Sequence, residues 1–180
     1  MVRKVYFGPN SVKRDPVELF ARRWHVRVLA LLYELNGARF VVLKGALGIS
    51  ADSLTRALDS LLRAGWVQRN PGYGHPLRPE YVLTESGRAL AAHCSRFQAT
   101  VEGLEVGPVI YRKWSAPSLI AIERGVERFS DLRDALRVTP RALTQSLVRL
   151  RDADLVTSGE RYANTRAGSR IARAAMALLA

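Results

Sequence analysis

Leucines recur at helical spacing in two separate stretches of the chain, residues 49–67 and 138–156. In each stretch the intervals are four and then three residues, which places the leucines on one face of a helix. They are Leu54, Leu58 and Leu61 in the first stretch and Leu143, Leu147 and Leu150 in the second. Ser50 and Thr139 stand where a helix N-cap is expected. The pattern therefore predicts two amphipathic helices, each with one face in a core.

These two stretches belong to a longer internal repeat. When the second half is moved back by 89 positions, residues 128–156 fall on residues 39–67 without a gap. The residues that agree are mostly apolar, so what repeats is a core. The agreeing pairs are Arg39/Arg128, Phe40/Phe129, Leu43/Leu132, Ala46/Ala135, Leu47/Leu136, Leu54/Leu143, Thr55/Thr144, Leu58/Leu147, Leu61/Leu150, Ala64/Ala153 and Val67/Val156.

Further elements are expected around each amphipathic helix. A Trp leads an apolar helix upstream, from Trp24 to Gly37 and from Trp114 to Gly125. Short helices are expected at 40–47 and 130–136, the second capped by Ser130. Two extended pairs are expected downstream, 66–69 with 80–83 and 155–158 with 161–164. Thr84 and Thr165 then cap a further helix in each copy, one running to about Gly103 and the other covering 166–179. At the N-terminus, 15–36 is expected to form one or two helices capped by Asp15.

This order of elements is that of a winged helix-turn-helix domain. Four motifs in it resemble the HxlR-type regulators of the MarR-like superfamily: the Trp-led helix, an Arg-Phe pair, the amphipathic segment and a closing Tyr-x-Leu-Thr-x-x-Gly phrase. Residues 113–168 match closely, with Arg128-Phe129, Thr139-Pro140-Arg141, Leu143-Thr144-Gln145 and the phrase from Tyr162 to Gly168. Residues 24–90 match more loosely, because Ala51-Asp52 replaces the Pro-Arg pair and the phrase runs from Tyr81 to Gly87.

Members of that family normally carry one such domain and form dimers. The resemblance therefore implies a mainly α fold with small β-wings (α+β), in which tandem winged helix-turn-helix domains form a pseudo-dimer within one chain. We expect an N-terminal arm and the start of the first helix at 1–23, a first domain with a long C-terminal helix at 24–106, and a second domain with a C-terminal helix at 107–180. Gly107-Pro108 marks the expected boundary.

Charge points to the class of partner. The formal net charge is +12 and the pI is about 10.8, which indicates a polyanion, most simply nucleic acid. Nearly all the cations are Arg, which suits bidentate contacts to phosphate and guanine. A genome-wide preference for Arg codons would produce the same composition.

Base-reading candidates lie on the two amphipathic helices, on faces away from the leucines. Arg141 and Gln145 fall in the first turns of the second helix, where Arg pairs well with guanine and Gln with adenine. The full set of base-reading candidates is Arg141, Ala142, Gln145, Arg149, Ser53 and Arg56. Because the first helix is close to neutral and the second is net positive, we expect the second domain to be the stronger base reader.

Backbone contacts are expected from the second helices, the caps and the wings. Cations that contact phosphates supply affinity without sequence information. These candidates are Lys44, Ser50, Arg69, His75, Arg78, Arg133, Arg137, Thr139 and Arg161. The first wing, between Val67 and Tyr81, is long and rich in Gly and Pro, whereas the second is minimal.

Other chemistry is not indicated. The three histidines do not sit at metal-ligand spacing with the lone cysteine, and no phosphate loop, nucleophile elbow or carboxylate pair stands out. We expect a non-enzyme without cofactor or metal. Trp24 and Trp114 are interpreted as core anchors rather than stacking platforms. Cys94 is interpreted as a small buried side chain, with a redox role as the alternative.

The leading hypothesis is a sequence-specific regulator of transcription that places two recognition helices in successive major grooves of double-stranded DNA. The alternatives are an architectural or replication-associated DNA binder with little base preference, and a winged-helix protein-interaction module. No apolar run approaches the roughly 18 residues of a membrane span, and a single cysteine fits a reducing cytoplasm. We expect a cytoplasmic, nucleoid-associated protein. We expect a monomer that acts as a pseudo-dimer; a homodimer through the terminal helices is the alternative.

Overall fold

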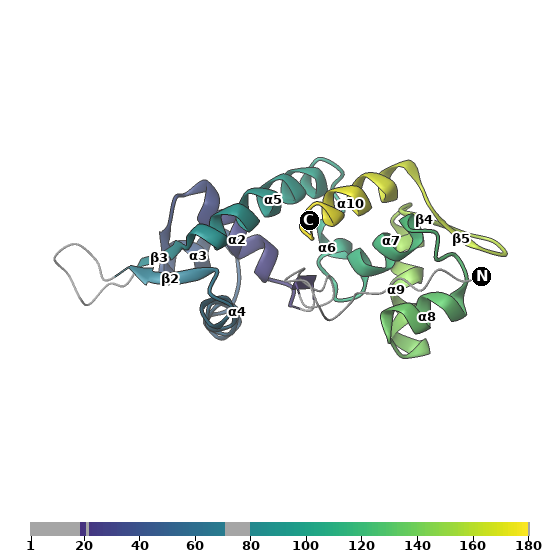
Figure 1. Cartoon of the computed structure of the whole chain (residues 1–180), viewed down its shortest axis with the longest axis horizontal. Helices are drawn as coiled ribbons and strands as arrows, with labels where there is room; N and C mark the ends of the chain where they lie inside the picture. Colours follow the sequence, from purple (N-terminus) through teal and green to yellow (C-terminus); the bar gives the residue numbers. More distant parts are fainter. Residues whose placement is uncertain (1–18, 21, 71–79, 180) are drawn as a thin grey trace. The chain divides into compact units, whose positions relative to one another are not determined.

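The computed structural model describes residues 19–20, 22–70 and 80–179 (Figure 1). Its internal contacts divide the chain into two compact units. The N-terminal unit is Arg22–Ala99, and the C-terminal unit starts at Thr100 and includes Leu19 and Phe20. Gly107-Pro108 lies beyond this division, where it begins the short helix α6 (Gly107–Ile110). The expected domain limits stay a prediction.

Helices and a small sheet make up the N-terminal unit. The elements are α2 (His25–Glu34), β1 (Ala38–Arg39), α3 (Phe40–Leu47), α4 (Ala51–Arg63), β2 (Val67–Asn70), β3 (Glu80–Leu83) and α5 (Glu85–Glu102), the last of which runs past the division. The sheet is antiparallel in the order β1-β3-β2, with Ala38 opposite Tyr81 and Val67 opposite Leu83. The sequence pattern predicted β2 and β3 but not the two-residue β1.

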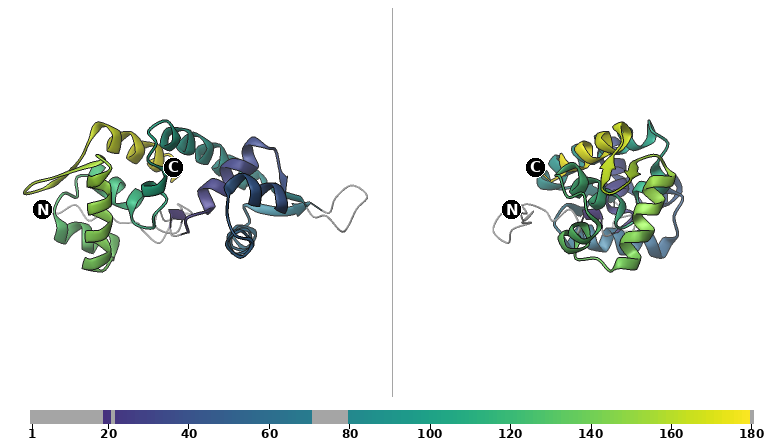
Figure 2. Two further views of the ribbon diagram at one scale, coloured as in Figure 1. Left: turned by 180° about the vertical axis from the view of Figure 1, so that it is seen from behind. Right: turned by 90° about the vertical axis from the view of Figure 1, so that its right-hand side faces the viewer.

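The C-terminal unit has a similar order of elements. They are α6, α7 (Ser115–Glu123), α8 (Phe129–Leu136), α9 (Pro140–Asp152), β4 (Val156–Ser158), β5 (Tyr162–Asn164) and α10 (Arg166–Met176). Strands β4 and β5 pair antiparallel, with Val156 opposite Asn164. Helix α10 packs along α7 (Figure 2). Both predicted wings are therefore present as strand pairs.

Both cores are built from the apolar faces that the leucine pattern predicted. The six leucines of the predicted pattern, three on α4 and three on α9, are buried, with exposed fractions of 0 to 3%. Cys94, in α5, is fully buried, as expected. Apolar side chains at these positions are removed from water, and that burial is the main stabilising contribution to such small units.

The two units correspond in detail at an offset of 89 residues. Helices α3 and α8 begin and end 89 positions apart, and so do α4 and α9. The turn between the helices of each pair contains a residue in the left-handed region, Gly48 at φ 61° and Arg137 at φ 49°. This turn sets the direction of the capped helix in both units.

In the N-terminal unit a threonine fastens the helix after the wing to the end of α4. The Thr84 hydroxyl donates to the carbonyl of Gly65 at 2.7 Å and accepts from the backbone N–H of Gly87 at 3.0 Å. Thr84 therefore caps α5, as predicted. Gly87 lies so close to the backbone carbonyl of Trp66 that a Cβ atom has no room there.

The C-terminal unit contains the same arrangement. The Thr165 hydroxyl donates to the carbonyl of Asp154 at 2.7 Å and accepts from the N–H of Gly168 at 3.1 Å. A Cβ on Gly168 would meet the carbonyl of Leu155. The repeated Thr and Gly of the sequence therefore have the same structural task in both units, which is to hold a helix against the preceding turn.

The cap expected at Ser130 and the buried position expected for Trp24 were wrong, and the cap expected at Asp15 lies outside the described residues. Ser130 lies inside α8 and bonds to the Asp131 carboxylate, while Arg128 occupies the N-cap position without a side-chain cap bond. Trp24 is the N-cap residue of α2 and does not lie in the buried core. The predicted cap at Asp15 falls outside the residues described.

Candidate nucleic-acid interface

Helix α9 presents an exposed polar face opposite its leucines. Arg141, Gln145 and Arg149 are exposed on it, as a base-reading role requires. Ala142 is half-buried, and its backbone N–H donates to the Thr139 hydroxyl at 3.4 Å. Thr139 therefore caps the helix as predicted. Of the base-reading candidates on α9, those with side chains long enough to contact a base edge are Arg141, Gln145 and Arg149.

Helix α4 begins in the same way. The Ser50 hydroxyl accepts from the backbone N–H of Ser53 at 3.3 Å and donates to the Ser53 hydroxyl at 3.0 Å. Arg56 is exposed one turn further on, while Ser53 is half-buried. The structure thus brings two base-reading candidates, Ser53 and Arg56, to the same side of α4, close to the first residues of the N-terminal unit.

The charges of the two helices differ. On α4 the charged residues are Asp52, Arg56, Asp59 and Arg63, which balance; on α9 they are Arg141, Arg149, Arg151 and Asp152, which leave a net positive charge. Arg151 lies 3.5 Å from Asp152. Neither Arg141 nor Arg149 forms an ion pair with an acidic side chain in the described part of the chain. The α9 surface is therefore the more favourable one for a polyanion.

Two of the backbone candidates are held by acidic neighbours. Arg133 bonds to Asp134 at 2.7 Å, and this hydrogen bond lowers the pKa of the aspartate. Arg161, between β4 and β5, lies 3.1 Å from Glu127. All four side chains are well exposed, so the pairs are weak in water and can be exchanged for phosphate contacts.

The remaining backbone candidates lie on a helix, a turn and a strand. Lys44 is exposed in the last turn of α3, and Arg137 is exposed in the turn that follows α8. The Arg69 guanidinium lies 5.7 Å from the centre of the Tyr81 ring, which orients it along the sheet. His75 and Arg78, on the long first wing, lie outside the described residues.

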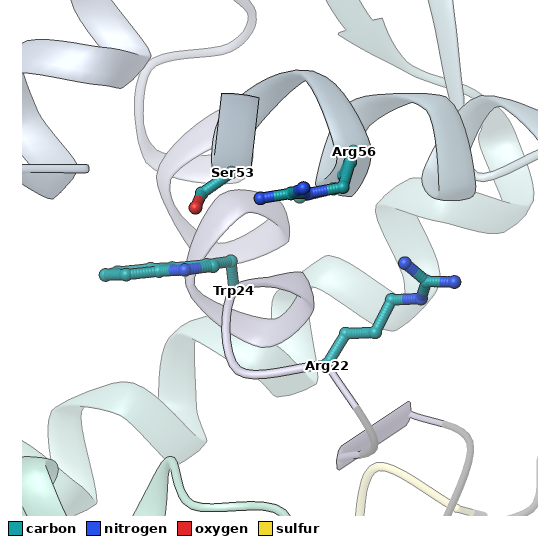
Figure 3. A pocket seen from close by; sticks show the side chains of 5 residues that line it. Arg22, Trp24, Ser53 and Arg56 are labelled. Atoms are coloured by element: carbon teal, nitrogen blue, oxygen red, sulfur yellow. The ribbon is translucent and has the colours of Figure 1, made fainter. Parts of the chain in front are cut away.

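A pocket at the start of α2 was not expected from the sequence. It has a volume of about 110 Å³ and is lined by Arg22, Trp24, Ser53, Arg56 and Ala57 (Figure 3). Trp24 is half-buried, so the interpretation of this residue as a core anchor is wrong. The sequence offered one signal for this pocket: two cations stand directly before Trp24 (Arg22-Arg23), as they do before Trp114 (Arg112-Lys113).

Trp114 is placed similarly in the C-terminal unit. It is also half-buried and also occupies the N-cap position of its helix, α7. The Lys113 ammonium lies 4.9 Å from the centre of its ring. A cation over a half-exposed indole is thus common to both units, and neither tryptophan is an ordinary core residue.

Other kinds of site are not indicated in the described ranges. Residues 19–20, 22–70 and 80–179 contain no group of three or more His, Cys, Asp or Glu side chains that could hold a metal ion. Among the helices described, none combines the length and the apolar character needed to cross a bilayer.

Helix, short helix, capped helix and strand pair define the fold of the N-terminal unit as a winged helix-turn-helix. A family model described as HxlR-like helix-turn-helix matches residues 19–104, which include all of this unit. The match falls on the half whose motifs resemble that family more loosely. No curated protein and no solved structure matches the chain significantly.

Proposed function

We propose that the protein is a transcription regulator that binds double-stranded DNA in a sequence-specific manner. The similarity of residues 19–104 to the HxlR-like helix-turn-helix family supports a DNA-binding regulator. The formal charge of +12 supports a polyanionic partner. The observation that carries the proposal is that both units contain a capped 13-residue helix whose apolar face is buried and whose polar face is exposed.

The second part of the proposal is that the two units are copies of one domain. Their helices, left-handed turns and Thr-Gly fastenings recur at corresponding positions. Homodimeric regulators read two half-sites with two identical helices. In this chain the two helices have diverged, so α4 and α9 would bind unequal half-sites in successive major grooves.

Base reading is assigned mainly to α9. Arg141 and Gln145 are exposed in its first turns, where side chains reach base edges, and Arg141 has no acidic partner among the described residues. A bidentate side chain discriminates against the wrong base by about 1–3 kcal/mol.

Selection from a random pool of DNA duplexes tests the proposal. The selected sequences are re-measured across a salt series, because phosphate contacts alone give strongly salt-dependent binding without base preference. An enriched motif with two unlike half-sites about one helical turn apart supports a regulator that reads with both units. Tight binding without a motif would favour an architectural DNA binder, and no binding would favour a protein-interaction module.

A double substitution, Arg141→Ala with Gln145→Ala, tests the assignment of the reader. We expect the preference for the selected motif over random DNA to fall at least tenfold, since two base contacts are lost. Arg151→Ala is the matched control, because Arg151 lies near the other end of the same helix beside Asp152. An unchanged preference in the double variant would show that α9 is not the reader.

A further inference from the structure

Five residues of the N-terminal unit form a small basic pocket beside the aromatic ring of Trp24. Arg22 and Trp24 come from the segment before α2; the other three wall residues, Ser53, Arg56 and Ala57, come from the first two turns of α4. In Figure 3 the Arg56 guanidinium and the Ser53 hydroxyl lie on the same side of the Trp24 ring. The pocket therefore joins the start of the unit to the proposed recognition helix.

Positive charge is concentrated around this pocket. The guanidinium carbons of Arg23 and Arg27 each lie 4.8 Å from the centre of the Trp24 ring. Arg22 and Arg56, which line the pocket, form no ion pair with an acidic side chain in the described ranges. Like charges held together raise the free energy of the empty pocket, and an anion between them lowers it.

The neighbouring His25 is affected by the same positive charge. It is buried, and burial lowers its pKa to about 4, with the charge of Arg22 acting in the same direction. A cation that disfavours protonation of the imidazole favours an anion at the same place.

The hydroxyl of Ser53 is oriented for donation. It accepts a hydrogen bond from the Ser50 hydroxyl, which leaves its own proton for another acceptor. It also lies in the first turn of α4, where the helix dipole favours negative charge. The Arg56 guanidinium and this hydroxyl suit a phosphate group, whose oxygens accept several hydrogen bonds at once. The Arg22 guanidinium points away from these two groups in Figure 3 and adds positive charge at the rim of the pocket.

At the corresponding place the C-terminal unit differs in all three wall residues that the capped helix supplies, one of them being Ser146 in place of Ala57. It keeps the tryptophan and cations of the segment before the first helix, but has Gln145 where α4 has Arg56 and Ala142 where α4 has Ser53. Neither of these two side chains carries charge. The anion-binding set is therefore a feature of the N-terminal unit.

We propose that this pocket, lined by Arg22, Trp24, Ser53 and Arg56, binds a backbone phosphate of the DNA that the N-terminal unit contacts. The proposal rests on the proposed function. It assigns Arg56 to phosphate binding rather than to base reading. The N-terminal unit would anchor the protein on the sugar-phosphate backbone, and α9 would supply most of the sequence discrimination.

Phosphate-ethylation interference on a selected duplex tests this assignment. Wild-type protein, Arg22→Ala and Arg56→Ala are compared, with Arg63→Ala as the control that removes one positive charge from the other end of α4. We expect about tenfold weaker binding for each of the first two variants, equally on all sequences, and a salt slope reduced by about one. At least one phosphate should lose its interference in both, while the control keeps the wild-type pattern.

Three results would overturn the proposal. The first is a wild-type interference pattern and affinity in both variants, with base preference intact, which would leave the proposed function standing. The second is a change of base preference in Arg56→Ala, which would make Arg56 a reader. The third is a wild-type protein that does not bind duplex DNA at all, which would remove the proposed function as well. Thermal unfolding verifies that each variant is folded, and Arg56→Lys, which keeps the charge, should lose less affinity than Arg56→Ala.

Calorimetry with inorganic phosphate distinguishes a second source of the same chemical group. If wild-type protein binds free phosphate and Arg56→Ala does not, while both bind DNA equally, the pocket serves a small phosphorylated molecule. That result would overturn the assignment to DNA. Weaker DNA binding by Arg56→Ala with no measurable uptake of free phosphate supports it.

Discussion

The two units share their framework and differ on their surfaces. Helices α4 and α9 have the same length, corresponding buried leucines and the same kind of cap, but differ in charge, which is balanced on α4 and net positive on α9. The same is true of the preceding helices: α3 exposes Val41 and Val42, whereas α8 has Ser130 and Asp131 at these positions. Packing therefore explains what the units have in common, and the differences lie on side chains that face solvent.

This contrast locates the functional differences on only a few side chains. At corresponding positions of α4 and α9, Arg56 faces the Trp24 pocket while Gln145 is a candidate base reader. Under the proposal that the units are copies of one domain, such divergence is expected, because each unit would contact only one half-site. Variants at corresponding positions are therefore the most direct test of which features are shared.

The largest expected effect concerns a shared feature. Gly87→Ala and Gly168→Ala each place a Cβ against the backbone carbonyl of Trp66 or Leu155, which cannot move without displacing the preceding turn. We expect each to lower the free energy of unfolding by about 3 kcal/mol. Denaturant unfolding followed by circular dichroism measures the loss.

Gly159→Ala is the control for these variants, because a Cβ at Gly159 has open space around it. It should change the stability by no more than about 0.5 kcal/mol. If only one of Gly87 and Gly168 were sensitive, the two Thr-Gly fastenings would not be equivalent, and the case for two copies of one domain would be weakened.

The second prediction concerns a residue that only the N-terminal unit has. His25 is buried and its folded-state pKa is about 4, below its unfolded value of 6.5; Ser115 stands in its place at the start of α7. Because the unfolded state binds the proton more tightly, stability is complete above pH 6.5 and falls as the pH drops toward 4, by up to about 3 kcal/mol.

Unfolding measured between pH 7 and pH 4 in wild type and in His25→Gln checks this pH dependence. Gln does not titrate, so the variant should lose less stability than wild type over that range, whatever its stability at pH 7. An identical pH profile for both proteins would show that the imidazole is protonated as readily in the folded state as in the unfolded state.

Much of the fold could be predicted from periodicity and repetition. The limits of α3 agree with prediction at both ends, and both wings lie within one residue of the expected strands. These elements have strong local signals: leucine spacing, capping residues, and glycine or threonine at fixed places. The repeat strengthened each signal, because a pattern seen twice at one offset is unlikely to be accidental.

The Trp24 pocket could not be predicted, because it depends on how two helices pack. A tryptophan at the start of an apolar helix looks like a core residue in sequence, and only the packing of α2 on α4 shows that its ring stays half-exposed beside Arg22 and Arg56. Strand β1 was missed for a similar reason. Its two residues have no pattern of their own and become a strand only by pairing with β3.

The third prediction compares two corresponding glutamates at the ends of α2 and α7. Glu123 is 16% exposed and accepts hydrogen bonds from three side chains, which also lower its pKa. The donors are Asn164 at 3.0 Å, Ser169 at 2.8 Å and Arg173 at 2.9 Å. Glu34 is exposed and accepts one bond, from Ser95 at 3.1 Å.

We therefore expect Glu123→Ala to cost about 2 kcal/mol of stability and Glu34→Ala about 0.5 kcal/mol. Thermal unfolding of both variants measures the difference. Glu123→Gln, which keeps an acceptor oxygen, should lie between wild type and Glu123→Ala. Equal losses at the two positions would mean that the hydrogen bonds of Glu123 contribute little beyond those of an exposed carboxylate.

The last prediction concerns substitutions in the turn of each unit, which should change the stability of the protein in opposite directions. Gly48 and Arg137 occupy the same left-handed position between the second and third helices of their units, at φ 61° and φ 49°. A side chain in this conformation costs about 1 kcal/mol. Gly48→Ala should therefore destabilise the protein by about 1 kcal/mol, although its Cβ meets no neighbour, and Arg137→Gly should stabilise it by a similar amount.

Arg137→Gly also removes an exposed cation that is a candidate phosphate contact, so the more stable variant should bind DNA more weakly. Arg137→Asn separates the two effects, because Asn tolerates the left-handed conformation better than Arg does and carries no charge. Chemical unfolding and DNA titration on the same three proteins give the result. If Arg137→Gly stabilised the fold and left DNA affinity unchanged, Arg137 would lie outside the interface, and no binding role would remain to explain why an arginine occupies a position that suits glycine.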